Sequence, residues 1–157
     1  MTIERLMTAG VETMDDEEIH QFLTNQGFGV LGLNAEAVPY LLPMSFGYDG
    51  EDHLYFTYVV DEDSQKERLT ADADRAAFLV YNAPATFQWQ SVALTGTIET
   101  LPPERWDEFE AVKSNAWRPD VFLEAEGDAT VRVYQFHVEE REGYKHTGLP
   151  EGFEQQE

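Results

Sequence analysis

Short runs rich in apolar and aromatic residues, separated by polar turns, recur along the chain and predict a protein built mainly from β-strands. In the segment 131–138 (VRVYQFHV), apolar and polar positions alternate with the period of two that is typical of a half-buried strand. Turns at 34–37 and at 49–50 join neighbouring strands into a meander. The pattern predicts six strands, at residues 28–33, 38–48, 53–60, 76–82, 87–100 and 131–138.

Helices are predicted where the apolar period changes from two to that of an amphipathic helix. Asp15 can cap the first helix together with Glu18, and Gly27 ends it. Two prolines open the last and longest helix, and Pro119 closes it. The three predicted helices span residues 14–25, 64–71 and 102–117.

Mostly consecutive strands joined by short turns favour an antiparallel sheet closed into a barrel, with the helices packed outside it. The sequence has neither the dinucleotide-binding fingerprint nor a P-loop, and Gly96 predicts a bulge or bend in its long strand. A length of 157 residues suits a single domain over 1–157. We expect its core at about 14–140 and a loosely ordered acidic tail at 141–157.

Charge narrows the choice of partner, because 10 Lys and Arg stand against 31 Asp and Glu, for a formal net charge of −21. Such a polyanion repels phosphate backbones and anionic lipid headgroups, so we expect no nucleic acid and no membrane as partner. A small-molecule ligand is expected instead. The Lys-poor, acidic balance resembles that of cytosolic proteins of extreme halophiles, and the alternative is an ordinary acidic mesophilic protein.

The setting and the available chemistry follow from what the sequence lacks. No apolar run is long enough for a membrane span and the start has no signal-type run, so we expect a cytoplasmic protein. Without cysteine there is no disulfide, thiolate nucleophile or Cys-based metal site. No metal site is predicted, because the histidines lack metal-ligand spacing: they are His20, His53, His137 and His146.

Residues 64–68 (SQKER) lie directly after a predicted strand and at the start of a helix. Ser64 with Glu67 fits a capping box, which is a purely structural interpretation. The alternative interpretation is a phosphate site, because free backbone N–H groups and the positive helix dipole attract anions at a helix start. Lys66, with Arg68 nearby, would add a local positive charge to this anionic chain.

Aromatic, sulfur and hydroxyl side chains gather in two strands, at 43–46 (PMSF) and 55–58 (YFTY). They could form a flat slot with hydrogen-bonding groups at its rim, suited to a planar heteroaromatic ring. An ordinary barrel core with aromatic residues explains the same pattern. Gln90 and Ser91 alternate between strand faces, so only one of the two can point into such a slot.

The ordered segments GVLGL, VPYLLPMSF, LYFTY, SQK and QSVALTG together resemble the pyridoxamine 5′-phosphate oxidase-related proteins, over roughly residues 14–100. The resemblance implies a six-stranded antiparallel FMN-binding split β-barrel and a homodimer with flavin at the subunit interface. Carried over residue by residue, it implies that the flavin ring lies along two strands and that the phosphate binds at the next helix start. The implied cofactor-binding residues are Met44, Ser45, Phe56, Thr57, Tyr58, Ser64, Gln65, Lys66, Gln90 and Ser91.

The sequence also departs from that family. The Arg-Leu-x-Pro signature for pyridoxal phosphate is absent, so oxidation of pyridoxamine phosphate is not expected. The nitroimidazole-resistance branch is closer over PYLLPMSFGYDG, although it carries His where this chain has Thr57. We therefore expect an FMN-binding oxidoreductase that takes hydride from a reduced nicotinamide and passes it to a small or aromatic acceptor. The alternatives are a reductase that uses deazaflavin F420 and a non-catalytic protein that binds flavin or haem.

Overall fold

The computed structural model describes residues 10–60, 65–73, 75–112 and 130–148, which form eight strands, three α-helices and one short 3₁₀ helix. The strands are β1 (Val11–Thr13), β2 (Phe28–Leu33), β3 (Tyr40–Ser45), β4 (Gly47–Tyr48), β5 (His53–Val60), β6 (Ala76–Ala85), β7 (Gln88–Thr100) and β8 (Thr130–Thr147). The helices are α2 (Asp16–Asn25), α3 (Gln65–Asp72), η1 (Pro103–Arg105) and α4 (Trp106–Val112).

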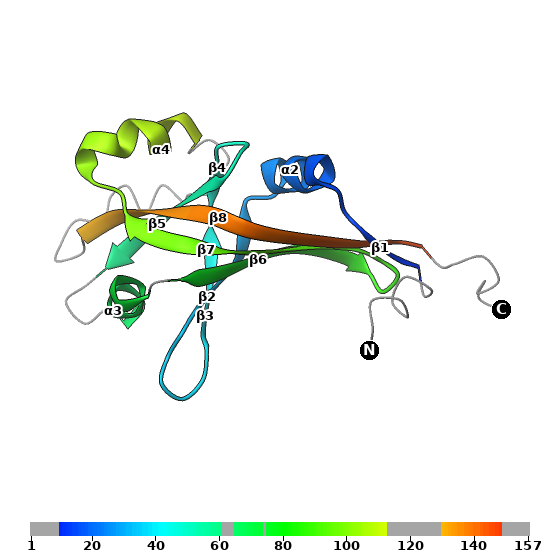
Figure 1. Ribbon diagram of the computed structural model, residues 1–157, viewed down its shortest axis with the longest axis horizontal. Coiled ribbons are helices and arrows are strands. Elements are labelled where there is room, and N and C mark those ends of the chain that lie inside the picture. The colour runs from blue at the N-terminus through cyan, green and yellow to red at the C-terminus, as the bar shows by residue number, and fades with distance from the viewer. Residues whose placement is uncertain (1–9, 61–64, 74, 113–129, 149–157) are drawn as a thin grey trace.

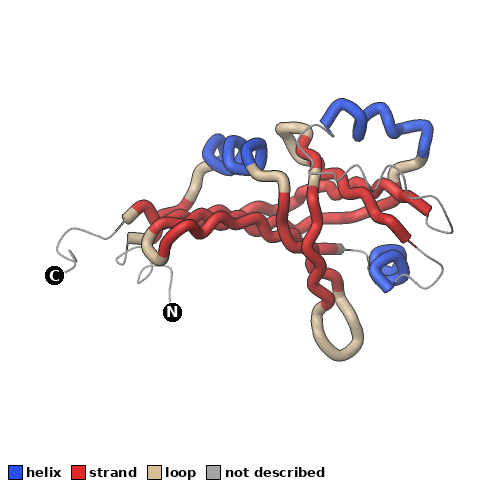
Figure 2. The backbone as a smooth tube through the Cα atoms, turned by 180° about the vertical axis from the view of Figure 1, so that it is seen from behind, coloured by secondary structure: helices blue, strands red, loops and turns tan. Residues whose placement is uncertain are grey.

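One antiparallel sheet carries the fold, with strand order β3-β2-β6-β7-β8-β5-β4 and with β1 added to the far end of β8. The sheet curls into half of a barrel, with α2 and α4 above the long strands and α3 below them in the view of Figure 1. Helices α2 and α3 both pack against the main core, whereas α4 packs on the opposite face of β5 and β8, over Tyr55 and Val133. Figure 2 shows the same arrangement from behind, with the β2–β3 hairpin crossing the long strands. The predicted mainly β, antiparallel split barrel with short outer helices is confirmed.

The predicted number of six strands is wrong, and Phe46 explains part of the difference. The segment predicted as one strand, 38–48, pairs first with β2 and then with β5. At the change of partner Phe46 is fully buried, and its N–H donates to the carbonyl of Gly27 at 3.1 Å. One predicted strand therefore becomes β3 and β4. The three-residue β1 was not predicted.

The last strand also extends beyond its predicted end at Val138, as far as Thr147. Its second half looks like a polar tail in the sequence because it contains Glu139, Glu140 and Glu142. It pairs nevertheless with β7, and at its end with β1. The described part of the tail that was predicted to be loose is therefore a strand of the sheet. The prediction of a single domain over the whole chain stays a prediction.

Large aromatic side chains fill the interior of the half-barrel, and Phe46, Phe56, Phe78 and Phe136 are all at most 1 % exposed. Helix α2 adds Ile19, Phe22 and Leu23 to this core, and the predicted cap is confirmed because the Asp15 carboxylate accepts from the N–H of Glu18 at 2.8 Å. A second, smaller cluster lies beneath α4 and consists of Tyr55, Leu101, Phe109 and Val133.

The predicted second helix, 64–71, is confirmed as α3, whose described residues are Gln65–Asp72. Of the predicted long helix 102–117, the described part contains η1 and α4, as far as Val112. The remainder and Pro119 lie outside the described residues. In the described part of the chain no helix has the length and apolar character needed to cross a membrane.

The predicted irregularity at Gly96 is confirmed as a β-bulge: the β7–β8 register shifts between Thr95 and Gly96, which leaves Glu139 unpaired opposite them. A methyl group on Gly96 would overlap the carbonyl oxygen of His137, and it would also lie 3.2 Å from the backbone nitrogen of Glu139. Since both neighbours are backbone atoms of a paired strand, they cannot move aside cheaply. The bulge therefore requires glycine.

We predict that Gly96→Ala lowers the free energy of unfolding by about 2 kcal/mol or more, because overpacking a rigid site forces the two strands apart. Urea unfolding followed by circular dichroism measures the change. Gly32→Ala is the matched control, since the nearest atom to its added methyl would lie at 3.7 Å, an ordinary contact. Equal stability of the two variants would contradict this account of the bulge.

Candidate functional site

The side of β3, β2, β6 and β7 that faces away from the core carries a band of apolar side chains. Val30 lies opposite both Pro43 and Leu79 in the strand register, and Leu41 and Tyr81 are 67 % and 56 % exposed. Exposed apolar patches in soluble proteins mark interaction or ligand surfaces. We call this band the outer apolar face: it consists of Phe28, Val30, Leu41, Pro43, Ala77, Leu79, Tyr81 and Ala93.

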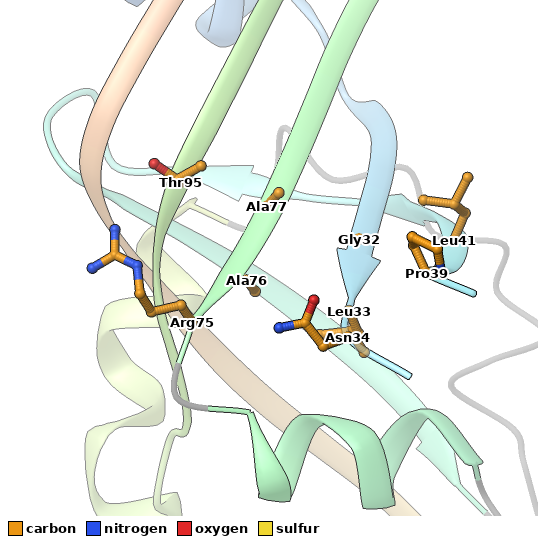
Figure 3. Close-up of a pocket in the computed structure, with 9 residues that line it drawn as sticks. All are labelled: Gly32, Leu33, Asn34, Pro39, Leu41, Arg75, Ala76, Ala77 and Thr95. Carbon is orange, nitrogen blue, oxygen red and sulfur yellow. The ribbon is translucent and has the colours of Figure 1, made fainter. Parts of the chain in front are cut away.

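A shallow depression of about 350 Å³ lies at one end of this face (Figure 3). Small residues on neighbouring strands form its floor, while Asn34 and Arg75 lie at its rim, and the Arg75 guanidinium pairs with Glu139. No local sequence motif marks these two residues, because the pairing of β2 with β6 brings them together. The lining residues are Gly32, Leu33, Asn34, Pro39, Leu41, Arg75, Ala76, Ala77 and Thr95.

Strand alternation divides the predicted ring-binding residues between two faces. Met44, Phe56 and Tyr58 point into the interior, where they belong to the main hydrophobic core. Phe56 packs against Phe78 with ring centroids 4.9 Å apart. A ligand on the outer side of the sheet is therefore separated from these three side chains by the backbone of their strands.

Ser45 and Thr57 lie on the opposite side and are half-buried. Ser45 ends β3, where it pairs with Phe28 of β2, and Thr57 lies in the middle of β5. Two hydroxyl groups therefore stand on adjacent segments of the outer side, where β3 and β5 approach each other. Of the predicted ring-binding residues on β3 and β5, these two are the ones available to an outer ligand.

Tyr58 has a positioning role instead, because its hydroxyl lies 3.1 Å from the hydroxyl of Thr70 on α3. Both residues are buried, and burial raises the pKa of the Tyr58 phenol above its ordinary value. The neutral phenol and the adjacent, tilted ring of Tyr134, with centroids 4.3 Å apart, hold α3 against the end of the barrel. The position of the helix that carries Lys66 is thus set from inside the core.

The predicted phosphate residues lie at the start of α3, beyond the end of β5. Gln65 is exposed and opens the helix, and the backbone of Lys66 lies in its first turn. Ser64 lies outside the described residues. The first turn of an eight-residue helix presents unpaired backbone N–H groups and the positive end of the helix dipole.

Gln90 and Ser91 face opposite sides of β7, as alternation requires. Ser91 pairs with Tyr81 and Tyr144 on the outer side, whereas Gln90 pairs with Lys145 on the side covered by α2. Thr57 pairs with Val133. Tyr144 lies eleven positions after Val133 on β8, about 35 Å of extended strand. The predicted site residues therefore form two groups, one near α3 and one near the far end of β7 (Figure 1).

A polar cluster not predicted from the sequence lies where α2 meets β4 and β8. Arg141 donates to Nε2 of His20 at 3.2 Å, so the proton of the neutral ring sits on Nδ1, against the Tyr48 hydroxyl. Tyr48 in turn donates to the carbonyl of Glu51 at 2.9 Å, and burial raises its pKa to about 12. The cluster fixes the β4–β5 turn to α2.

The comparisons with known proteins agree with this architecture. Residues 15–145 match the sequence model of the family described as pyridoxamine 5′-phosphate oxidase. The chain belongs to this family. The match includes every described element except β1 and the last residues of β8. No curated protein matches the chain at a significant level.

Solved structures of the same fold come from several bacteria. An FAD-binding protein from Mesorhizobium loti is 21 % identical, with a TM-score of 0.72 over 87 % of this chain and 97 % of its own. An FAD- and haem-binding protein from Mycobacterium smegmatis is 18 % identical, with a TM-score of 0.67 over 90 % of this chain and 76 % of its own. At these identities the likeness establishes the fold of this member of the family and no more.

A third solved structure is a proposed 5-nitroimidazole antibiotic resistance protein from Bacteroides thetaiotaomicron. It is 17 % identical and has a TM-score of 0.64, over 87 % of this chain and 89 % of its own. The resemblance to the pyridoxamine 5′-phosphate oxidase-related proteins is thus confirmed at the level of the family. The branch within it and the halophilic origin stay predictions.

Proposed function

We propose that this protein binds FMN on the outer side of its sheet and acts as an oxidoreductase. The membership of residues 15–145 in the pyridoxamine 5′-phosphate oxidase family is the observation that carries the proposal. Flavin binding by two solved structures of the same fold supports it. The missing pyridoxal phosphate signature argues for a substrate other than pyridoxamine phosphate.

The residues near α3 fit a flavin mononucleotide. The hydroxyls of Ser45 and Thr57 suit the polar edge of a flat ring, and the adjoining outer apolar face offers a surface on which such a ring can lie. The first turn of α3 suits the phosphate, with backbone N–H groups and the ammonium of Lys66 as its partners. In this proposal Met44, Phe56 and Tyr58 support the site from inside the core.

The proposed site requires a second copy of the chain. Ser91 and Thr57 of one chain are separated by about 35 Å along the sheet, so they cannot both reach one flavin. In a homodimer formed through the outer apolar face, Ser91 of one chain can meet the α3 end of the other. Flavin at the subunit interface would then contact Ser45 and Thr57 of one chain and Ser91 of the other.

The flavin would supply the redox chemistry, and the protein would supply binding and orientation. The hydroxyls of Ser45 and Thr57 would fix the ring, and the apolar face would exclude water from one side of it. The proposed electron donor is a reduced nicotinamide, and the proposed acceptor is a small or aromatic compound. Deazaflavin F420 in the same site is one alternative. A non-catalytic flavin or haem binder is the other, which the FAD- and haem-binding protein of the same fold favours.

We predict that the purified protein binds FMN and that Lys66→Ala weakens this binding about 10- to 150-fold. A charge-assisted hydrogen bond to a phosphate contributes about 1.5–3 kcal/mol, which corresponds to that range. Quenching of flavin fluorescence measures the affinity. Lys145→Ala is the matched control, because its ammonium pairs with Glu18 on α2, away from α3. Unchanged affinity in Lys66→Ala would refute the phosphate site, and a wild-type protein that takes up F420 or haem in place of FMN would refute the choice of cofactor.

The enzymatic role is tested on the FMN-loaded protein under anaerobic conditions. We expect reduced nicotinamide to bleach the flavin absorbance, and a quinone or a nitro compound to restore it. Bound FMN that neither NADH nor NADPH reduces would indicate a non-catalytic flavin binder. The visible spectrum of protein purified from its native host, with no FMN added, identifies directly the cofactor that the protein carries.

We predict a dimer that Leu79→Glu and Tyr81→Glu each weaken, because a carboxylate would then be buried in the outer apolar face. Light scattering after size exclusion should give at least about a tenfold higher dissociation constant, together with weaker FMN binding. Gln21→Glu, which adds the same charge to the exposed side of α2, is the control. A wild-type monomer that binds FMN tightly would overturn the two-chain site.

A further inference from the structure

Two histidines that the proposed flavin site does not use face each other across β5 and β8. His53 and His137 are direct partners in the strand register. Nε2 of His53 lies 3.2 Å from Nδ1 of His137, and the ring centroids are 5.0 Å apart. Both rings reach solvent: His137 is exposed, and the side chain of His53 is 33 % exposed. The two ring nitrogens are therefore in hydrogen-bond contact at an accessible place on the surface.

The orientation of His53 is fixed from behind by Asp49. Oδ2 of this carboxylate lies 2.9 Å from Nδ1 of His53, so the proton of the neutral ring is held on Nδ1 and the lone pair of Nε2 is left facing His137. The other oxygen, Oδ1, accepts from the backbone N–H groups of Glu51 and His53 at 2.8 and 3.1 Å. Carboxylate, histidine and turn form one rigid unit.

The turn that carries this unit is attached to β8 beside His137. The N–H of Val138 donates to the carbonyl of Asp52 at 2.8 Å, and Arg141 binds the Asp52 carboxylate at 2.5 Å. The two backbone segments that carry the histidines are therefore held together on both sides of the pair. The β5–β8 ladder does this on one side, and the contacts of Asp52 do it on the other. Such preorganisation lowers the cost of bringing two ligands to one ion.

We propose that His53 and His137 bind a divalent transition-metal ion of the class that prefers imidazole, such as Zn²⁺, Ni²⁺ or Cu²⁺. Metal–nitrogen bonds of about 2.0–2.1 Å to atoms 3.2 Å apart give a nitrogen–metal–nitrogen angle of roughly 100°. That angle lies between the octahedral and the tetrahedral value. The proton of His137 moves from Nδ1 to Nε2 when Nδ1 becomes a ligand, which leaves both imidazoles neutral.

The groups around the two histidines favour a cation, but they leave some of its coordination positions to water. Asp49 supports His53 in the way that carboxylates support histidine ligands in metal sites. Within the described residues no cluster of three or more ligating side chains is present, so water would occupy the other coordination positions. The net charge of −21 raises the local concentration of divalent cations. The inference is independent of the proposed flavin chemistry.

Isothermal titration of the tag-free full chain with ZnCl₂ tests the proposal. We expect one ion per chain, and an affinity reduced roughly 100-fold in both His53→Gln and His137→Gln, because either change leaves a single imidazole and removes the chelate effect. Asp49→Asn keeps the acceptor oxygen of the turn but loses the charge behind His53, so a reduction of about 10- to 100-fold is expected. His146→Gln, at the other end of the sheet, is the matched control and should bind like the wild type.

A second measurement identifies the ligands directly. With one equivalent of Cu²⁺, electron paramagnetic resonance should reveal two nitrogen ligands in the wild type and one in each histidine variant, and circular dichroism checks that the variants are folded. Folded His53→Gln and His137→Gln variants that bind Zn²⁺ as tightly as the wild type would overturn the proposal. So would a wild-type protein that binds no Zn²⁺ at millimolar concentration.

Discussion

The hydrogen-bonded ladder along β8 is the constraint on which the rest of the structure depends. Its first half pairs with β5, most of its length pairs with β7, and its far end also pairs with β1. A strand between two others must bond its backbone groups to both, which fixes the register of every neighbour. The ladder thereby sets the face on which each side chain lies, and it sets the distance between Thr57 and Ser91.

The bulge at Gly96 determines which side chains β8 turns inward. Before it, Phe136 and Val138 point into the core. If Glu139 took a regular place in the ladder, without the bulge, alternation would point Glu140 and Glu142 inward as well, and unpaired buried carboxylates are very costly. With the extra residue, Gly143 faces inward instead, against Met14 and Ile19. One inserted residue therefore lets a strand rich in charge continue across the whole sheet.

Local sequence patterns were sufficient to predict much of the fold, but they predicted little of how the candidate site is arranged. The bounds of β2 and β5, the cap at Asp15 and the bulge at Gly96 follow from neighbouring residues, so they could be predicted. The change of partner at Phe46 and the second half of β8 depend on pairing between distant segments, which no local pattern records. The distance between Thr57 and Ser91 also depends on such pairing. The sequence therefore suggested a single slot, whereas the register places these two residues far apart.

The negative charge of the chain opposes formation of the proposed dimer, whereas its exposed apolar surface favours it. Bringing together two chains that each carry −21 costs electrostatic energy, while covering Leu41, Leu79 and Tyr81 of both returns hydrophobic energy. Salt changes the electrostatic energy far more than the hydrophobic energy, since the screening length falls from about 10 Å at 0.1 M to about 3 Å at 1 M. A face that is too repulsive to pair in dilute buffer can therefore pair in concentrated salt, so the acidic composition and the outer apolar face are compatible in one design.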